Sequence, residues 1–313
     1  MSLSALEELI KVARSFKELE EPVVLVGGYA AFLLIEPRHR PTLRTTEDVD
    51  YVFQASNRVD FYHMAERMRA LGFSECADQG APICRWVVDG VLVDVMPCSE
   101  EALGFSNRWY PLAMQEPLIV ELEPELPIAV ARPLVYLGTK FEALNNRGDN
   151  SDLIGNTDLE DIVTVIAYGN EFLPELDSID PALRAYLQEQ ATRLLSRDRI
   201  EELVSGCLSG DSQSQACVPR VLEALRVMST GLVIYLSQEH LEFLNRPSLL
   251  SGKGGHQEYF RELSRQRSGN RQPISLNQVQ QARKRLAALR GAGTWQAAYS
   301  VVLQYFGEEY RDL

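Results

Sequence analysis

The chain has 313 residues, of which 45% are hydrophobic and 24% charged, the composition of an ordinary globular protein with room for two domains. Its longest apolar runs, AAFLLI and GLVIYL, are far shorter than the roughly 20 residues that a membrane-spanning helix needs, so we expect a cytoplasmic protein with no signal peptide and no membrane partner. The 5 cysteines form no C-x-x-C pair and only 4 histidines are present, which argues against a disulfide framework and against a zinc site.

The first elements expected are a helix over residues 2–19 and a short strand over 23–26, from the spacing of their apolar residues. Gly27 and Gly28 follow this strand, and the sequence after them, YAAFLLI, is typical of a helix. Glycine lets the backbone approach a ligand closely, and the amides at the start of the helix would point at an anion such as a triphosphate. The alternative is an ordinary glycine turn.

Two aspartates open the next predicted strand, DVDYVF. Residues two apart on a strand share a face, so the side chains of Asp48 and Asp50 project together while Val49 points into the core. Two carboxylates held this close repel each other unless a cation lies between them, and Mg²⁺ can bridge carboxylates to substrate phosphates. The alternative is a solvated end of a strand.

A third carboxylate is predicted inside a β-hairpin. The segment ICRWVVDGVLVDVMP indicates two strands joined by a turn at Asp89 and Gly90, with Asp94 in the middle of the second strand. An acidic residue in so apolar a strand needs a partner. Either a metal ion shared with the aspartate pair or Arg85, across the hairpin, would serve.

Further elements are expected along the chain. They are a helix over 57–71 that ends at Gly72, a pair of strands over 117–132, and a helix capped by Thr157, with Glu160 completing a capping box. From residue 171 onward the β pattern disappears and the chain is almost entirely helix-patterned.

A second group of charged residues is expected on two helices. Lys140 and Arg147 are seven residues apart, two helical turns, so both would lie on one face and could reach phosphates. Asp158 and Asp161 are three apart on the following helix and would also share a face. The alternative for all four is a solvated helix surface with ordinary ion pairs.

The motifs occur in a defined order. In sequence they are Gly27-Gly28, then Arg44-x-Thr46-x-Asp48-Val49-Asp50-Tyr51, then Asp94, then Lys140-x-x-Ala143-x-x-x-Arg147, then Asp158-x-x-Asp161. This order resembles the DNA polymerase beta-type nucleotidyltransferases. Within that superfamily it is most similar to the AbiEii/MenT-like toxins of bacterial type IV toxin–antitoxin systems, over roughly residues 20–170.

The resemblance implies an α/β (α+β) fold with a mixed-sheet nucleotidyltransferase domain over 1–170, and the helical pattern that follows predicts an all-helical domain over 171–313. The resemblance also implies Mg²⁺-dependent transfer of a nucleoside monophosphate from an NTP to an acceptor hydroxyl, such as an RNA or tRNA end, with an antitoxin as partner. The expected catalytic residues are Asp48, Asp50, Asp94, Lys140 and Asp161, of which Asp48, Asp50 and Asp94 hold the metal. The expected nucleotide-binding residues are Gly27, Gly28, Arg44, Lys140 and Arg147.

The charge is uneven along the chain. Residues 1–170 hold 14 Lys and Arg against 27 Asp and Glu, so the net charge of −13 belongs to this half, while residues 171–313 hold 17 of each. Within the second half, 253–290 has nine basic and two acidic residues, which favours an RNA phosphate contact or is a solvated face. The loop residues Arg38, His39, Arg40 and Arg44 could likewise contact a triphosphate or substrate, or keep a long loop soluble.

Two other functions remain open from the sequence. A small-molecule or protein nucleotidyltransferase, for instance one that modifies antibiotics, would use the same three aspartates without a basic segment. A non-catalytic interaction module would keep the fold but would not bind an NTP with Mg²⁺.

Overall fold

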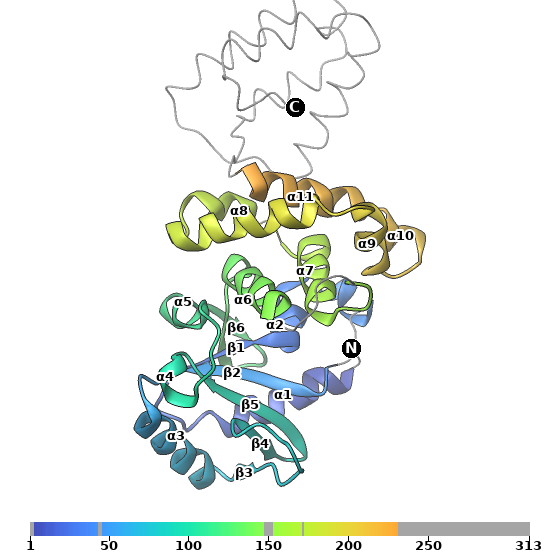
Figure 1. Cartoon of the computed structure of the whole chain (residues 1–313). Helices are drawn as coiled ribbons and strands as arrows, with labels where there is room; N and C mark the ends of the chain where they lie inside the picture. Colours follow the sequence, from blue (N-terminus) through green and yellow to red (C-terminus); the bar gives the residue numbers. More distant parts are fainter. Residues whose placement is uncertain (1–2, 43–45, 147–152, 171, 231–313) are drawn as a thin grey trace, which may run out of the picture.

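The computed structural model describes residues 3–42, 46–146, 153–170 and 172–230 (Figure 1). The predicted basic segment 253–290, the predicted helices beyond 230, Arg44 and Arg147 lie outside the described residues. The strands are β1 (Val23–Val26), β2 (Asp48–Phe53), β3 (Ser74–Glu75), β4 (Arg85–Val88), β5 (Val91–Pro97), β6 (Leu118–Glu121) and β7 (Pro127–Val130). The α-helices are α1 (Leu3–Ser15), α2 (Gly27–Leu34), α3 (Arg58–Ala70), α4 (Glu100–Leu103), α5 (Tyr110–Gln115), α6 (Pro133–Asn146), α7 (Thr157–Tyr168), α8 (Pro181–Leu195), α9 (Ile200–Gly206), α10 (Ser212–Gln215) and α11 (Val218–Thr230), and the 3-10 helices are η1 (Pro37–Thr42) and η2 (Leu173–Asp177).

The strands form one mixed sheet in the order β3-β4-β5-β2-β1-β7-β6. Strand β2 is central and pairs parallel with β5 and antiparallel with β1, which in turn pairs parallel with β7. The predicted hairpin is confirmed, since β4 and β5 join through Asp89 and Gly90, both with positive φ; the predicted pair of strands over 117–132 is also confirmed, as β6 and β7, which pair antiparallel. The expected mixed α/β class is therefore confirmed for the described residues.

Strand β2 divides the sheet into two faces. Tyr51 and Phe53 point to the face covered by α1 and α3, where the ring of Tyr51 lies 4.9 Å from that of Phe16 and the ring of Phe53 lies 6.3 Å from that of Phe61. Fully burying one such aromatic side chain contributes roughly 2–3 kcal/mol. Because side chains alternate along a strand, this packing turns the aspartates of β2 to the opposite face, beneath α2, α6 and α7 (Figure 1).

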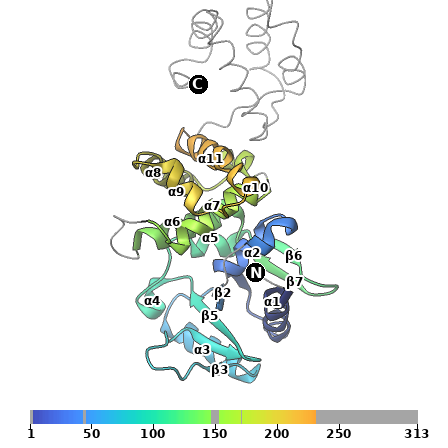
Figure 2. The ribbon, with the colours of Figure 1, turned by 90° about the vertical axis from the view of Figure 1, so that its right-hand side faces the viewer.

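The helices after the sheet form a further layer. Helix α6 is buried along most of its length, α8 packs on α6, and α11 packs on α7 and α8 (Figure 2). One continuous hydrophobic core runs from the sheet to Leu225 and Met228 in α11. Residues 172–230 therefore share the core of the sheet, and a domain division at residue 170 stays a prediction.

One predicted helix cap is wrong. Asn156, and not Thr157, caps α7: its side-chain oxygen accepts hydrogen bonds from the backbone N–H groups of Asp158 at 3.0 Å and Leu159 at 3.2 Å. Thr157 is the first helical residue, so Glu160 is displaced from the capping-box position. The cap one residue earlier leaves Asp158 and Asp161 on one buried face of the helix, as the spacing predicts.

Candidate active site

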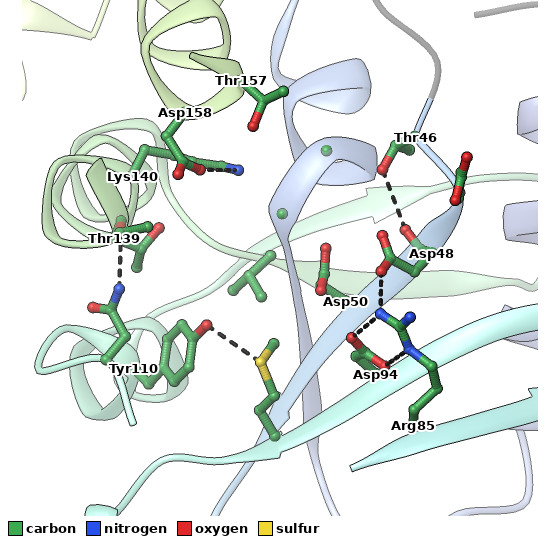
Figure 3. A pocket seen from close by; sticks show the side chains of 17 residues that line it. Thr46, Asp48, Asp50, Arg85, Asp94, Tyr110, Thr139, Lys140, Thr157 and Asp158 are labelled. Carbon is green, nitrogen blue, oxygen red and sulfur yellow. Dashed lines mark hydrogen bonds and ion pairs between the residues drawn. The ribbon is translucent and has the colours of Figure 1, made fainter. Parts of the chain in front are cut away.

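Strand register brings the three predicted metal ligands together. In the parallel pairing of β2 with β5, Asp50 lies directly opposite Asp94, and Asp48 lies two residues earlier on the same face. Asp48, Asp50 and Asp94 each offer a carboxylate oxygen, and these oxygens all lie within 4.8 Å of one another. The aspartate pair predicted on one face of β2 and the aspartate predicted within the apolar strand β5 therefore lie side by side in the sheet (Figure 3).

A guanidinium group is bound to two of these carboxylates. Strand β4 places Arg85 opposite Asp94, and its Nε and Nη2 donate to Asp94 Oδ1 and Oδ2, each at 2.8 Å. Nη2 also donates to Asp48 Oδ2 at 2.5 Å. Arg85, one of the two partners considered for Asp94 from the sequence, therefore pairs with it across the hairpin and also joins β5 to β2 (Figure 3).

Asp50 is in a different electrostatic position. No described residue forms an ion pair or a hydrogen bond with its carboxylate. Burial, and next the negative charge of Asp48, raise the pKa of Asp50 from 3.8 to about 7, against the smaller opposing effects of Lys140 and Arg85. Three hard oxygen donors, one of them lacking a cation, suit a divalent ion such as Mg²⁺.

The glycine pair touches this cluster. Gly27 has a φ of +65°, and a Cβ on it would lie 1.8 Å from Asp50 Oδ2. A Cβ on Gly28 would lie 2.9 Å from the Cβ of Thr46. The start of α2 can therefore pass this close to the carboxylates only because both positions lack side chains.

Gly27→Ala is expected to disturb the site as well as the fold. The left-handed conformation costs an L-residue roughly 1–2 kcal/mol, and the added methyl group must push Asp50 aside. Gly72→Ala is the matched control, because Gly72 has a φ of +88° but nothing within 4 Å of its Cβ position. Both variants should unfold at lower urea, and only Gly27→Ala should lose calorimetric Mg²⁺ binding. Equal Mg²⁺ affinity in the two variants would show that Mg²⁺ binding does not depend on the lack of a side chain at Gly27.

Lys140 forms a second cation–carboxylate group. Its Nζ lies 2.7 Å from Asp161 Oδ2 and 3.2 Å from Asp158 Oδ1, and all three side chains are buried. Burial acts to lower the pKa of Lys140, but the two carboxylates outweigh it and hold the pKa raised. This group sits on α6 and α7, across the cleft from the aspartates of the sheet (Figure 3).

The two groups border one cleft of about 530 Å³. Of the predicted site residues it is lined by Gly27, Gly28, Asp48, Asp50, Asp94 and Lys140, together with Val26, Thr46, Glu47, Arg85, Met96, Asn107, Tyr110, Thr139, Ala143, Thr157 and Asp158. Asp161 does not line the cleft; it lies behind Lys140, with which it forms an ion pair.

Sequence reasoning missed the wall formed by the loop before α5. Asn107 donates to the backbone oxygen of Thr139 at 2.8 Å and accepts from the backbone N–H of Trp109 at 3.1 Å, which anchors this loop on α6. Tyr110 Oη donates to Met96 Sδ at 3.5 Å. No periodic pattern marks this loop, so its place at the cleft follows only from the fold.

The basic residues after α2 pack away from the cleft. The His39 ring stacks on Tyr168 with centroids 4.3 Å apart, and the guanidinium of Arg40 lies 4.6 Å from the centroid of Phe32. Neither lines the cleft in the described part of the chain. Among the described helices, moreover, none has the length and apolarity required to cross a membrane.

Comparisons with known proteins give little guidance. No protein-family model and no curated protein matches the chain. A solved structure that is similar is the solution structure of the antibiotic-resistance factor ANT(2'')-Ia, with 15% sequence identity over 62% of this chain and 97% of that chain, at a TM-score of 0.35. Because a TM-score this low shows neither a shared fold nor a shared activity, a functional assignment rests on the geometry of the cleft.

Proposed function

We propose that this protein is a Mg²⁺-dependent nucleotidyltransferase that moves a nucleoside monophosphate from an NTP to an acceptor hydroxyl. The observation that carries the proposal is the convergence of Asp48, Asp50 and Asp94 within 4.8 Å, directly against the glycine start of α2. Hard oxygen ligands beside backbone amides that favour anions are what a metal-bound triphosphate requires.

The residues of the cleft suggest a division of labour. Asp48 and Asp50 would hold Mg²⁺, which supplies charge neutralisation for the triphosphate. Lys140 has three ammonium donors, of which Asp158 and Asp161 take two, so the third can reach a phosphate across the cleft. The acceptor oxygen forms a bond to the α-phosphorus, the bond to the β-phosphate oxygen breaks, and pyrophosphate leaves with that electron pair. Asp94 either ligates the metal or takes the proton of the hydroxyl.

The charge of the cleft bears on the acceptor. Its lining holds five carboxylates, Glu47, Asp48, Asp50, Asp94 and Asp158, against two cations, Arg85 and Lys140. An acidic cleft attracts a cationic acceptor, which favours a small hydroxylated amine of the aminoglycoside type. An RNA acceptor, and with it a toxin role with an antitoxin partner, is supported by motif resemblance and by the basic segment 253–290.

Transfer of label from α-³²P-NTPs tests the reaction and the acceptor together. The full chain is incubated with each NTP and Mg²⁺ in the presence of total RNA, a panel of aminoglycosides, or protein. We expect label in one acceptor pool, lost on chelation of the metal. If the pool is RNA, changing Arg283, Lys284 and Arg285 to Glu should flatten the salt dependence of RNA binding by roughly one unit of slope per lost phosphate contact. No labelled product and no Mg²⁺-dependent NTP binding would instead indicate a non-catalytic module.

A further inference from the structure

Arg85 occupies the place of a cation in the carboxylate cluster. It binds both oxygens of Asp94 and one oxygen of Asp48, and these two residues are members of the three-carboxylate cluster that could ligate a metal. Arginine stays protonated at any pH at which the protein is folded, so the positive charge cannot leave by losing a proton. It can leave only if the side chain moves.

We propose that Arg85 is a resident counter-ion of this cluster, which a divalent cation must displace from at least one carboxylate in order to bind. The proposal rests on the proposed function, because it assigns the metal to Asp48, Asp50 and Asp94. A metal ion and a guanidinium that share the same carboxylate oxygens repel each other at contact distance. Metal binding therefore costs the charge-assisted hydrogen bonds of Arg85.

The side chain has room to withdraw. Arg85 lies on the wall of the cleft, and its side chain is 24% exposed, compared with 11% for Asp94. The guanidinium can thus turn toward the cleft without opening the core, which on this strand is formed by Trp86 and Val88. An incoming triphosphate offers it a new anionic partner.

Two consequences follow for the metal-free and metal-bound protein. Without metal, Arg85 holds the repelling carboxylates of β2 and β5 in place. With metal, the lost arginine contacts weaken binding of the free ion, whereas a metal–triphosphate complex brings both the cation and a replacement partner for Arg85. The cluster should therefore bind a metal–nucleotide complex more tightly than it binds the free metal ion.

Binding of Mn²⁺ to the full chain, followed by electron paramagnetic resonance without nucleotide, tests the proposal. Arg85→Gln should bind Mn²⁺ tighter by about 10- to 100-fold, the range that one or two charged hydrogen bonds represent. Arg85→Lys, which keeps a charge but not the two-pronged contact, should lie between it and the wild type. Arg69→Gln is the matched control: it removes the same charge from a residue that pairs with exposed Glu75, and it should leave the affinity unchanged.

The outcomes separate this proposal from the proposed function. Equal or weaker Mn²⁺ binding by Arg85→Gln, with measurable binding by the wild type, would overturn the role of Arg85 alone. Failure of both proteins to bind Mn²⁺ would overturn the metal assignment and the proposed function with it.

A measurement on the wild type keeps the proposal testable if Arg85→Gln does not fold. The ¹⁵Nε–¹Hε resonance of Arg85, assigned by its loss in Arg85→Lys, should shift when Mg²⁺ saturates the site. If neither this resonance nor the ¹⁵Nη–¹Hη resonances of Arg85 shift under saturating Mg²⁺, the guanidinium keeps its contacts with both Asp94 and Asp48, and the proposal is overturned.

Discussion

Asp50→Asn is expected to reduce nucleotidyl transfer by roughly 10³-fold or more, the order of loss that follows removal of a preorganised electrostatic contact. Asp50 is central to the cluster and, among the described residues, its carboxylate has no cation partner. The rate is measured in single turnovers with labelled NTP at saturating Mg²⁺. Asp89→Asn is the matched control, because it makes the same change in the exposed turn of the hairpin, where Asn also tolerates a positive φ.

The same substitution should stabilise the metal-free protein. The pKa of Asp50 is raised from 3.8 to about 7, so its charged form is disfavoured by folding. The protonated carboxyl of Asp50 therefore contributes its full stabilisation below pH 3.8, and this stabilisation is lost as the pH rises through 7. In urea unfolding without metal, the free energy of unfolding of Asp50→Asn relative to that of the wild type should rise by about 2–3 kcal/mol between pH 5 and pH 8.

Mg²⁺ should reverse this order, because it stabilises only a protein that binds it. Near wild-type transfer by Asp50→Asn at saturating Mg²⁺ would show that the metal assignment is wrong. A stability difference that does not change between pH 5 and pH 8 would show that Asp50 is ionised without cost in the metal-free fold.

Features set by local periodicity could be predicted from the sequence. The common face of Asp48 and Asp50 follows from the two-residue repeat of a strand. The pairing of Arg85 with Asp94 follows from the two-residue turn, because the length of a hairpin loop fixes the register of its strands.

Features set by contacts between distant elements could not be predicted. The close approach of Gly27 to Asp50 depends on the direction in which α2 leaves the sheet beside β2, and no sequence pattern specifies that direction. Asn107 reaches the cleft through a loop without periodicity. The helix spacing placed Lys140 on a face, but its two carboxylate partners depend on the packing of α6 against α7.

The cleft is thus bordered by two cations, each held by two carboxylates. Arg85 lies between Asp48 and Asp94 on the sheet, while Lys140 lies between Asp158 and Asp161 on the helices. The first group is partly exposed and its cation can move; the second is buried and fixed. We therefore expect the Arg85 group to exchange its cation for a metal ion, whereas Lys140 stays in place as part of the fold.

Lys140→Met should therefore destabilise the protein by about 3–5 kcal/mol, because it removes the buried ammonium group that pairs with both Asp158 and Asp161. Urea unfolding of the metal-free chain measures this loss. Lys17→Met, which removes an exposed lysine, is the matched control and should stay within about 0.5 kcal/mol of the wild type. A loss no larger than that of the control would show that the ion pairs of Lys140 do not stabilise the fold.

Neutralising the partners separates the structural role of Lys140 from its role toward phosphate. A triple variant, Lys140→Met with Asp158→Asn and Asp161→Asn, removes the ammonium group together with the two carboxylates that it pairs with, and should recover most of the lost stability. Transfer should stay depressed, by about 2–4 kcal/mol in activation free energy, if the third ammonium donor contacts the triphosphate. The comparison requires a readout at saturating NTP, since a weakened nucleotide complex alone would raise KM and leave kcat unchanged. If the stabilised triple variant transfers nucleotide at the wild-type rate, Lys140 acts only by holding α6 against α7.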